Sequence, residues 1–288
     1  MGSTPCEACG QQMEPWQIAR SCVLLRCPRC GHVVRDLERC PAGARSHPWG
    51  GNSTLDRIRI ALTWRQLQTL LAGRGALDIL EIGFGRGLLL ERLVDAPDGH
   101  RLTGVDRGLL QTGVVESVRA AATLFDDAAE NLRLPDSSLD LIYAIHVVEH
   151  LDDPAAVFAN CRRMLREGGL LYLMTPNARS DGLRLFRDRW WNLEDPTHVR
   201  FFSPDSIRSM LGRAGFRSAR VATHVLDSLT LEVSSVARAL QRGGAGDEHG
   251  VLSNAATAPL YAVLTPVALA ARAMWPALSP SMEVTARA

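Results

Sequence analysis

A buried-strand pattern runs directly into a glycine-rich turn and a helix at residues 77–93, LDILEIGFGRGLLLERL. A short apolar run that ends in a glycine cluster is typical of a strand in a sheet covered on both faces. The glycines Gly83, Gly85 and Gly87 let the backbone turn tightly and let a ligand approach it closely. The segment therefore predicts an α/β domain with a ligand at the carboxyl end of this strand.

Further apolar segments alternate with helical patterns along the chain. The seven predicted strands are 77–82, 101–105, 123–126, 139–145, 169–175, 218–225 and 282–286. Repeated strand–helix units predict a Rossmann-like, doubly wound, mostly parallel seven-stranded sheet. We predict one domain over residues 55–288, with a first helix over 55–71 and a helical insertion at 226–280 before the last strand.

The glycine turn lacks one element of a dinucleotide site. The G-x-G-x-x-G fingerprint would need a third glycine where Leu88 or Leu90 stands. Asp106 ends the next predicted strand, 19 residues beyond Gly87, where a carboxylate accepts hydrogen bonds from ribose hydroxyls. These residues predict a nucleoside site without a pyrophosphate cradle.

Composition excludes several classes of function. The formal net charge is +1, and all 32 basic residues are arginine. A chain without lysine has neither a Walker-type phosphate loop nor a Schiff-base mechanism. Its balanced charge gives no field that draws it to nucleic acid. The start of the sequence does not match a secretory signal, which predicts a cytoplasmic location.

Six of the seven cysteines lie within the first 40 residues. Two C-x2-C pairs, each followed by a glycine, are separated by 17 residues and predict a structural zinc site. Its predicted ligands are Cys6, Cys9, Cys27 and Cys30. Spare candidates are Cys22, Cys40, His32 and His47. We predict a zinc-ribbon domain over residues 1–45, and a linker follows at 41–54.

Five segments follow one another in a recognisable order: LEIGFGRG, GVDRG, AENLRLPDSSLDLIYAIHVVEHLDDP, CRRMLREGGLLYLMTPN and HVRFFSPDSIRSMLGRAGF. Over about residues 55–225 they resemble the motifs of class I S-adenosylmethionine-dependent methyltransferases. The resemblance is to the branch that includes quinone and sugar methylases. Some members of that branch also begin with a short C-x2-C ribbon.

The resemblance implies a role for each residue of the cofactor site. S-adenosylmethionine would lie with its methionine part against Glu81, Gly83, Gly85 and Gly87, and with its ribose on Asp106. The family often has an acid after the third strand that contacts adenine. Here Asp126 and Asp127 are available, and Asp127 is our prediction. His146, at the carboxyl end of the fourth strand, would contact the cofactor or the acceptor.

Methyl transfer from a sulfonium is an in-line displacement, so the enzyme positions a nucleophile and removes its proton. A histidine suits that role for a hydroxyl acceptor. The candidates are His198, His146 and His150, and a structural role is the alternative for His150. Aromatic residues around His198, among them Trp190 and Phe201, predict either an apolar lid or ordinary core packing.

The sequence leaves the acceptor open. O-methylation of a small-molecule hydroxyl, on a natural product, quinol, sugar or lipid-linked compound, is the leading hypothesis. Alternatives are a C-methyltransferase acting on an activated carbon, an RNA (rRNA) methyltransferase, and a non-enzymatic binding module. The uncharged run within 250–278 suggests peripheral membrane contact or a homodimer interface.

Overall fold

The computed structural model of the 288-residue chain describes residues 4–19, 22–41, 53–108, 113–194, 197–223 and 258–288, and single positions between 233 and 240. The chain divides into two compact units. The first comprises residues 1–56, 175–209 and 222–282. The second comprises residues 57–174, 210–221 and 283–288.

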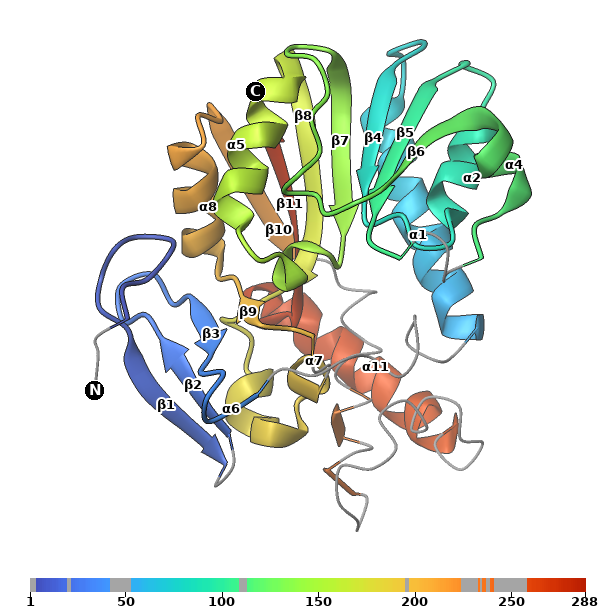
Figure 1. Ribbon diagram of the computed structural model, residues 1–288. Helices are drawn as coiled ribbons and strands as arrows, with labels where there is room; N and C mark the ends of the chain where they lie inside the picture. The colour runs from blue at the N-terminus through green and yellow to red at the C-terminus, as the bar shows by residue number, and fades with distance from the viewer. Residues whose placement is uncertain are drawn as a thin grey trace. The chain divides into compact units, whose positions relative to one another are not determined.

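A seven-stranded sheet forms the centre of the domain predicted over residues 55–288, with the strand order β10-β11-β8-β7-β4-β5-β6 (Figure 1). Its strands are β4 (Asp78–Ile82), β5 (Arg101–Asp106), β6 (Ala122–Asp126), β7 (Leu139–Ile145), β8 (Leu165–Pro176), β10 (Ser218–Thr223) and β11 (Ser281–Arg287). The five strands from β6 to β8 pair in parallel. The predicted doubly wound, mostly parallel seven-stranded sheet is confirmed.

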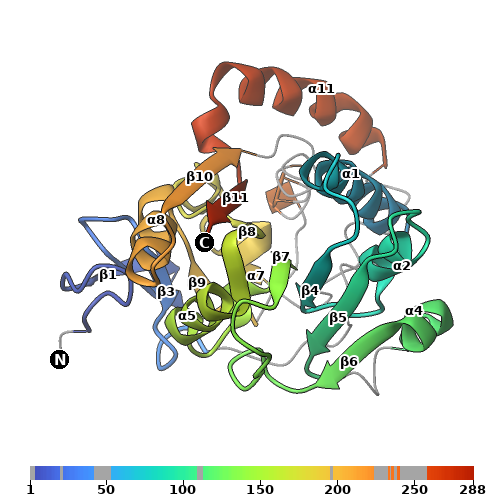
Figure 2. The ribbon, with the colours of Figure 1, turned by 90° about the horizontal axis from the view of Figure 1, so that it is seen from above.

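Helices cover both faces of this sheet. They are α1 (Ser53–Leu71), α2 (Leu88–Val94), α4 (Glu116–Ala121), α5 (Pro154–Met164) and α8 (Pro204–Arg213). The 3-10 turn η1 (Val148–His150) follows β7. Apolar side chains of α1, α2 and α4 pack on one face, and they include Leu67, Leu71, Leu89, Leu90, Leu93 and Val118. Figure 2 shows α5 on the opposite face.

The order of strands places a switch point beside β4. Its neighbours are β5 on one side and β7 on the other. Crossovers run to opposite faces from such a point, so the loops after β4 and β7 diverge and leave room for a ligand. The glycine turn predicted to bind a ligand follows β4 and therefore lies at this switch point.

The first unit contains a four-stranded sheet in the order β1-β2-β3-β9. β1 (Glu14–Ala19), β2 (Cys22–Arg26) and β3 (Val33–Arg35) come from the predicted ribbon. The fourth strand, β9 (Arg200–Phe201), comes from far along the chain and pairs with β3 through Val33–Phe201 and Val34–Arg200. Between β8 and β9 lie α6 (Gly182–Phe186), η2 (Arg187–Arg189) and α7 (Trp191–Glu194).

Part of the predicted insertion at 226–280 is described. α11 (Ala258–Met274) and η4 (Pro276–Leu278) are helical, whereas residues 224–232 and 241–257 lie outside the described residues. Val263, Val267, Met274 and Trp275 are exposed on this segment. Among the residues that the structure describes, no helix is both long and apolar enough to cross a membrane.

Candidate functional site

The turn after β4 has three glycines in the left-handed region. Gly83, Gly85 and Gly87 have φ values of +74°, +54° and +80°, which other L-residues rarely adopt. A Cβ added at Gly83 would lie 2.2 Å from Cγ2 of Val147. The turn therefore needs glycine at position 83 both for its backbone conformation and for its close approach to the segment after β7.

Gly83→Ala should lower the free energy of unfolding by about 2 kcal/mol more than Gly99→Ala. Gly99 is a matched control because it also has a positive φ (+67°) but has no atom within 4 Å of an added Cβ. Urea unfolding of the two variants measures the difference. Equal losses of stability in the two variants would show that the chain relieves the contact between the added Cβ and Val147 without a loss of folding free energy.

Asp106, at the end of β5, holds the glycine turn from the next strand. Its Oδ2 accepts a hydrogen bond from the backbone N–H of Gly85 at 2.6 Å. Burial raises the pKa of the Asp106 carboxyl, the bond from Gly85 opposes this, and the charge of neighbouring Asp126 adds to the rise. The carboxylate therefore fixes the loop with one oxygen, and its other oxygen can serve a ligand.

Glu81 is almost completely buried near the end of β4. The hydroxyl of Tyr143 donates a hydrogen bond to its Oε2 at 2.8 Å. Burial raises the pKa of Glu81 to about 8, although the bond from Tyr143 favours the charged form. The sequence analysis missed Tyr143, which lies directly opposite Glu81 in the β4–β7 register. A buried carboxyl of this kind is best satisfied by a cationic group.

His146 directly follows β7 and has a φ of +55°. Its Nδ1 lies 3.3 Å from Oε1 of Glu149, a fully buried side chain in η1. Glu149 therefore orients the imidazole ring of His146. The backbone N–H of His150 bonds to the carbonyl of Val147 at 2.9 Å, so His150 closes the same short turn.

The two acids after β6 make different contacts. Asp127 accepts hydrogen bonds from the N–H of Ala128 (2.7 Å) and from Nδ2 of Asn131 (2.8 Å), within its own loop. The bond from Asn131 is the main reason that the pKa of Asp127 is lowered. Asp126 accepts from the N–H of Gly108 at 3.0 Å. Adenine contact by Asp127 stays a prediction.

The predicted cofactor residues all lie at the carboxyl edge of four adjacent strands in the second unit. They are Glu81, Gly83, Gly85, Gly87, Asp106, Asp127 and His146. Together they offer backbone N–H groups, the buried carboxyl of Glu81, the half-buried carboxyl of Asp106 and a fixed imidazole. This set suits a ligand that combines ribose hydroxyls with a cationic portion.

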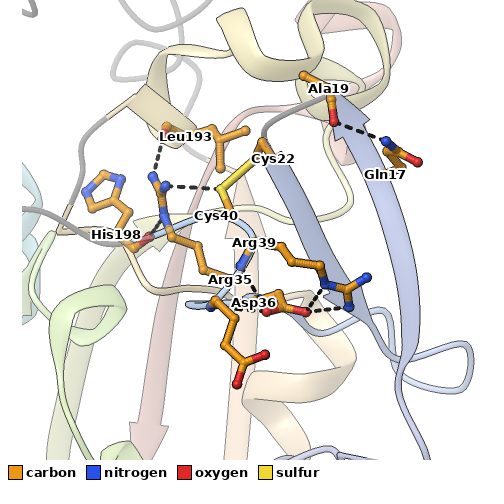
Figure 3. The surroundings of a disulfide bond; sticks show 10 residues. Gln17, Ala19, Cys22, Arg35, Asp36, Arg39, Cys40, Leu193 and His198 are labelled. Carbon is orange, nitrogen blue, oxygen red and sulfur yellow. Dashed lines mark hydrogen bonds and ion pairs between the residues drawn. A yellow bond between two sulfur atoms is a disulfide. The ribbon is translucent and has the colours of Figure 1, made fainter. Parts of the chain in front are cut away.

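His198 lies in the first unit and is buried. Its Nδ1 donates to the carbonyl of Asn192 at 2.5 Å. Its own carbonyl accepts from Nε of Arg35 at 2.6 Å, and the same guanidinium donates to the carbonyl of Leu193 (Figure 3). Sequence reasoning missed Arg35, whose partners are distant backbone carbonyls that leave no side-chain pattern.

The aromatic residues beside His198 are core residues. Trp190 and Phe201 are buried and pack together with Ile18, Leu24 and Val33 of the ribbon. The alternative of ordinary packing therefore holds for these two residues, and they do not form a lid. The reason is that β9 adds to the ribbon sheet and carries Phe201 into its core.

The four predicted zinc ligands converge. The Sγ atoms of Cys6, Cys9, Cys27 and Cys30 all lie within 4.8 Å of one another. A glycine with positive φ closes each C-x2-C turn, which we call a zinc knuckle. The N–H of Gly10 donates to the carbonyl of Cys6, and the N–H of Gly31 donates to the carbonyl of Cys27. Sulfurs on a tetrahedral zinc with bonds of about 2.3 Å are about 3.8 Å apart, so the cluster fits the metal.

Three of the four spare candidates for zinc binding make other contacts. Cys22 and Cys40 form a disulfide that closes a sequence separation of 18 residues. Their sulfurs pack in the ribbon core, and Nη1 of Arg35 lies 3.4 Å from Sγ of Cys40. His32 bonds to Glu7 and Ser206 rather than to the cysteine cluster. His47 lies outside the described residues.

A methyltransferase-domain family model matches residues 55–221. This chain belongs to the class I S-adenosylmethionine-dependent methyltransferases. The matched range contains the glycine turn, Asp106 and the segment from Tyr143 to His150. The cofactor-site predictions therefore fall on the part of this methyltransferase that defines its family.

Curated relatives align with part of their own length. A "Probable S-adenosylmethionine-dependent methyltransferase" of Mycolicibacterium smegmatis is 33% identical over 163 residues, covering 55% of this chain and 58% of the relative. A ubiquinone biosynthesis O-methyltransferase of Cereibacter sphaeroides is 31% identical over 162 residues, covering 52% and 64%. The methyltransferase thus spans between about half and two thirds of these proteins.

Solved structures agree in fold. An S-adenosylmethionine-dependent methyltransferase from Archaeoglobus fulgidus is similar with a TM-score of 0.51 and 21% identity, covering 80% of this chain and 94% of that one. At this identity the likeness concerns the fold alone.

Proposed function

We propose that this methyltransferase transfers the methyl group of S-adenosylmethionine to a hydroxyl group of a small molecule. The glycine turn, Glu81 and Asp106 would receive the cofactor. The buried Glu81 carboxyl would face the cationic methionine part, and Asp106 would bind the ribose. Both roles use groups whose pKa is raised by burial and would be lowered by a positive ligand.

The observation that carries the hydroxyl acceptor is the geometry of His198. Because its Nδ1 donates to the carbonyl of Asn192, Nε2 is the ring nitrogen that takes up a proton when the imidazole is neutral. A general base of this kind accepts the hydroxyl proton as the oxygen attacks the methyl carbon. Bound S-adenosylmethionine would supply the methyl group from its sulfonium and would become a thioether, so the transfer would need no covalent enzyme intermediate.

The relatives and the charge support a small acceptor. The Cereibacter relative is named as an O-methyltransferase of ubiquinone biosynthesis, and a quinol hydroxyl is the corresponding class of acceptor here. A net charge of +1 does not favour the phosphate contacts that an RNA substrate requires. Carbon methylation and RNA methylation remain the alternative outcomes of the test.

The proposal is tested by incubating the purified chain with methyl-labelled S-adenosylmethionine and a panel of quinols, glycosides, activated-carbon compounds and RNA. Label on the hydroxyl oxygen of a small molecule is the expected result. Label on carbon or only on RNA would replace the proposal with one of its alternatives. Cofactor binding without transfer to any class would favour the binding module.

With an acceptor in hand, His198→Gln should lower kcat about 100-fold and change cofactor affinity less than three-fold, because the base acts only on the acceptor. His100→Asn is the matched control, since His100 bonds to the N–H of Leu77 at the amino-terminal edge of the sheet. Rates and calorimetry on both variants make the comparison. Full turnover by His198→Gln would remove this residue from the mechanism.

We also propose that Cys6, Cys9, Cys27 and Cys30 bind one structural zinc ion. Without metal, burial raises the pKa of the Cys6 thiol to about 11, so binding must release protons. Metal analysis should give about one zinc per chain. Cys27→Ser should lose it, and Cys161→Ala, a buried cysteine in α5, should keep it.

The exposed apolar side chains of α11 and η4 keep the two partner predictions open as proposals. Contact with a membrane surface would show as sedimentation with anionic vesicles, and a homodimer as a doubled mass in solution. Residues 250–257 of the predicted contact segment lie outside the described residues.

A further inference from the structure

The ribbon and the segment from residue 183 to residue 209 are joined by side chains that neither the zinc site nor the cofactor site uses. Glu7, between two zinc-ligand cysteines, is one of them. Its Oε1 accepts hydrogen bonds from Nε of Arg200 at 2.9 Å and from Nε2 of His32 at 2.7 Å. Nδ1 of His32 lies 3.3 Å from the hydroxyl of Ser206, and His32 is completely buried.

The zinc knuckles themselves accept bonds from α8 and the residue before it. The hydroxyl of Ser203 donates to the carbonyl of Cys30, which is a predicted zinc ligand. The hydroxyl of Ser209 donates to the carbonyl of Ala8 at 2.8 Å. Each knuckle therefore carries a hydrogen bond from the same short stretch, and the backbone around the metal and this stretch fix each other.

Arg35 makes the corresponding connection at the other end of the ribbon (Figure 3). Its guanidinium donates to the carbonyls of Leu193 and His198, and its backbone N–H donates to the carbonyl of Val199 at 2.9 Å. One nearly buried side chain thus fixes positions on both sides of the turn that contains His198. The Nδ1 bond from His198 to Asn192 depends on the same turn.

We propose that the zinc ribbon is the scaffold that positions His198, with Arg35 and Glu7 as positioning residues. Zinc holds the knuckles, the knuckles and β3 hold residues 198–209, and Arg35 fixes the backbone on which the imidazole is oriented. The proposal rests on the proposed function only for the role of His198 as base. Loss of zinc from the ribbon should then disturb the position of His198, the residue proposed to act on the acceptor. It should leave the cofactor site unchanged.

Hydrogen exchange on the full chain, with and without a zinc chelator, tests this coupling. We expect residues 4–41 and 198–209 to lose protection together, by at least ten-fold, while β4 and β5 change less than two-fold. Calorimetry with S-adenosylhomocysteine should show less than a three-fold change in affinity. Retained protection of 198–209 in the metal-free chain would overturn the proposal, and so would a parallel loss in β4 and β5.

A second measurement follows the His198 ring itself. Nitrogen NMR of histidine-labelled chain should show His198 with its proton on Nδ1, and His198→Gln assigns the signal. Arg35→Met should mix the two tautomers, and Arg35→Lys should restore part of the original signal. Arg39→Met is the control, because Arg39 forms an ion pair with Asp36 within the ribbon.

An unchanged His198 signal in a folded Arg35→Met chain would overturn the role of Arg35. Glu7→Gln provides a second variant if Arg35→Met does not fold, and it should lower the protection of 198–209 without removing zinc. Neither measurement uses an acceptor. Failure of the acceptor screen would therefore count against the proposed function and leave the coupling standing.

Discussion

Asp106→Asn should weaken S-adenosylhomocysteine binding about 100-fold, measured by calorimetry. The substitution removes the charge that would hold the ribose hydroxyls, and it weakens the bond that fixes the N–H of Gly85. Two charge-assisted hydrogen bonds at about 1.5 kcal/mol each account for a loss of this size. Both interactions weaken together, because the same carboxylate accepts the bond from Gly85 and would bind the ribose.

Asp136→Asn is the control for this result, because Asp136 is an exposed carboxylate that pairs with Arg163. It should leave the affinity within two-fold of wild type. Asp126→Asn and Asp127→Asn then separate the two candidates for adenine contact, since only the residue that contacts the base should cost about ten-fold. A cofactor affinity within three-fold of wild type in Asp106→Asn would contradict the assigned site.

Glu81→Gln should remove a dependence of stability on pH that is worth about 4 kcal/mol. The pKa of Glu81 is raised by burial to about 8, from about 4.5 in the unfolded chain. Its proton stabilises the folded, cofactor-free chain fully below pH 4.5, and this contribution is lost as pH rises through about 8. The glutamine variant stays neutral throughout and should be the more stable chain at pH 9.

Urea unfolding of the cofactor-free proteins at pH 5, 7 and 9 measures the effect. Tyr143→Phe serves as a comparison, because it removes the hydrogen bond that favours the carboxylate and so should move the transition to higher pH. Cofactor binding should also release a proton below pH 8, since a cationic ligand favours ionised Glu81. A parallel pH dependence in wild type and Glu81→Gln would contradict the assignment.

The central sheet could be predicted because its middle strands β4, β7 and β8 are mostly buried apolar runs. β8 shows where this fails. The predicted strand started at residue 169, because Gly168 and Gly169 suggest a turn. In the structure β8 already begins at Leu165. In the structure a register shift between β7 and β8 accommodates them as a bulge.

The residues predicted for the cofactor site lie at one edge of the sheet because each follows a strand, but their roles stay predictions. Tyr143 could have been found only with the β4–β7 register, which requires knowing that these strands are neighbours. The convergence of Cys6, Cys9, Cys27 and Cys30 followed from their spacing. The Cys22–Cys40 disulfide did not, because spacing does not determine which spare cysteines pair.

The contacts of the ribbon could not be predicted. β9 is only two residues long and has no periodicity to detect. Arg35 and Ser203 bind backbone carbonyls, which every residue offers, so the sequence contains no sign of their partners. The contacts between the ribbon and the stretch around His198 therefore could not be predicted, although the sequence analysis had identified both segments.

The shared sheet of β3 and β9 also means that the ribbon is not an interchangeable module. A shortened chain that begins after residue 41 would leave an unpaired edge at β9 and would uncover Phe201 and Trp190. Such a chain should aggregate during expression. Exchange of ribbons between homologous enzymes should succeed only when the later segment is transplanted with them, so recombination would have to move two distant stretches of the gene at once.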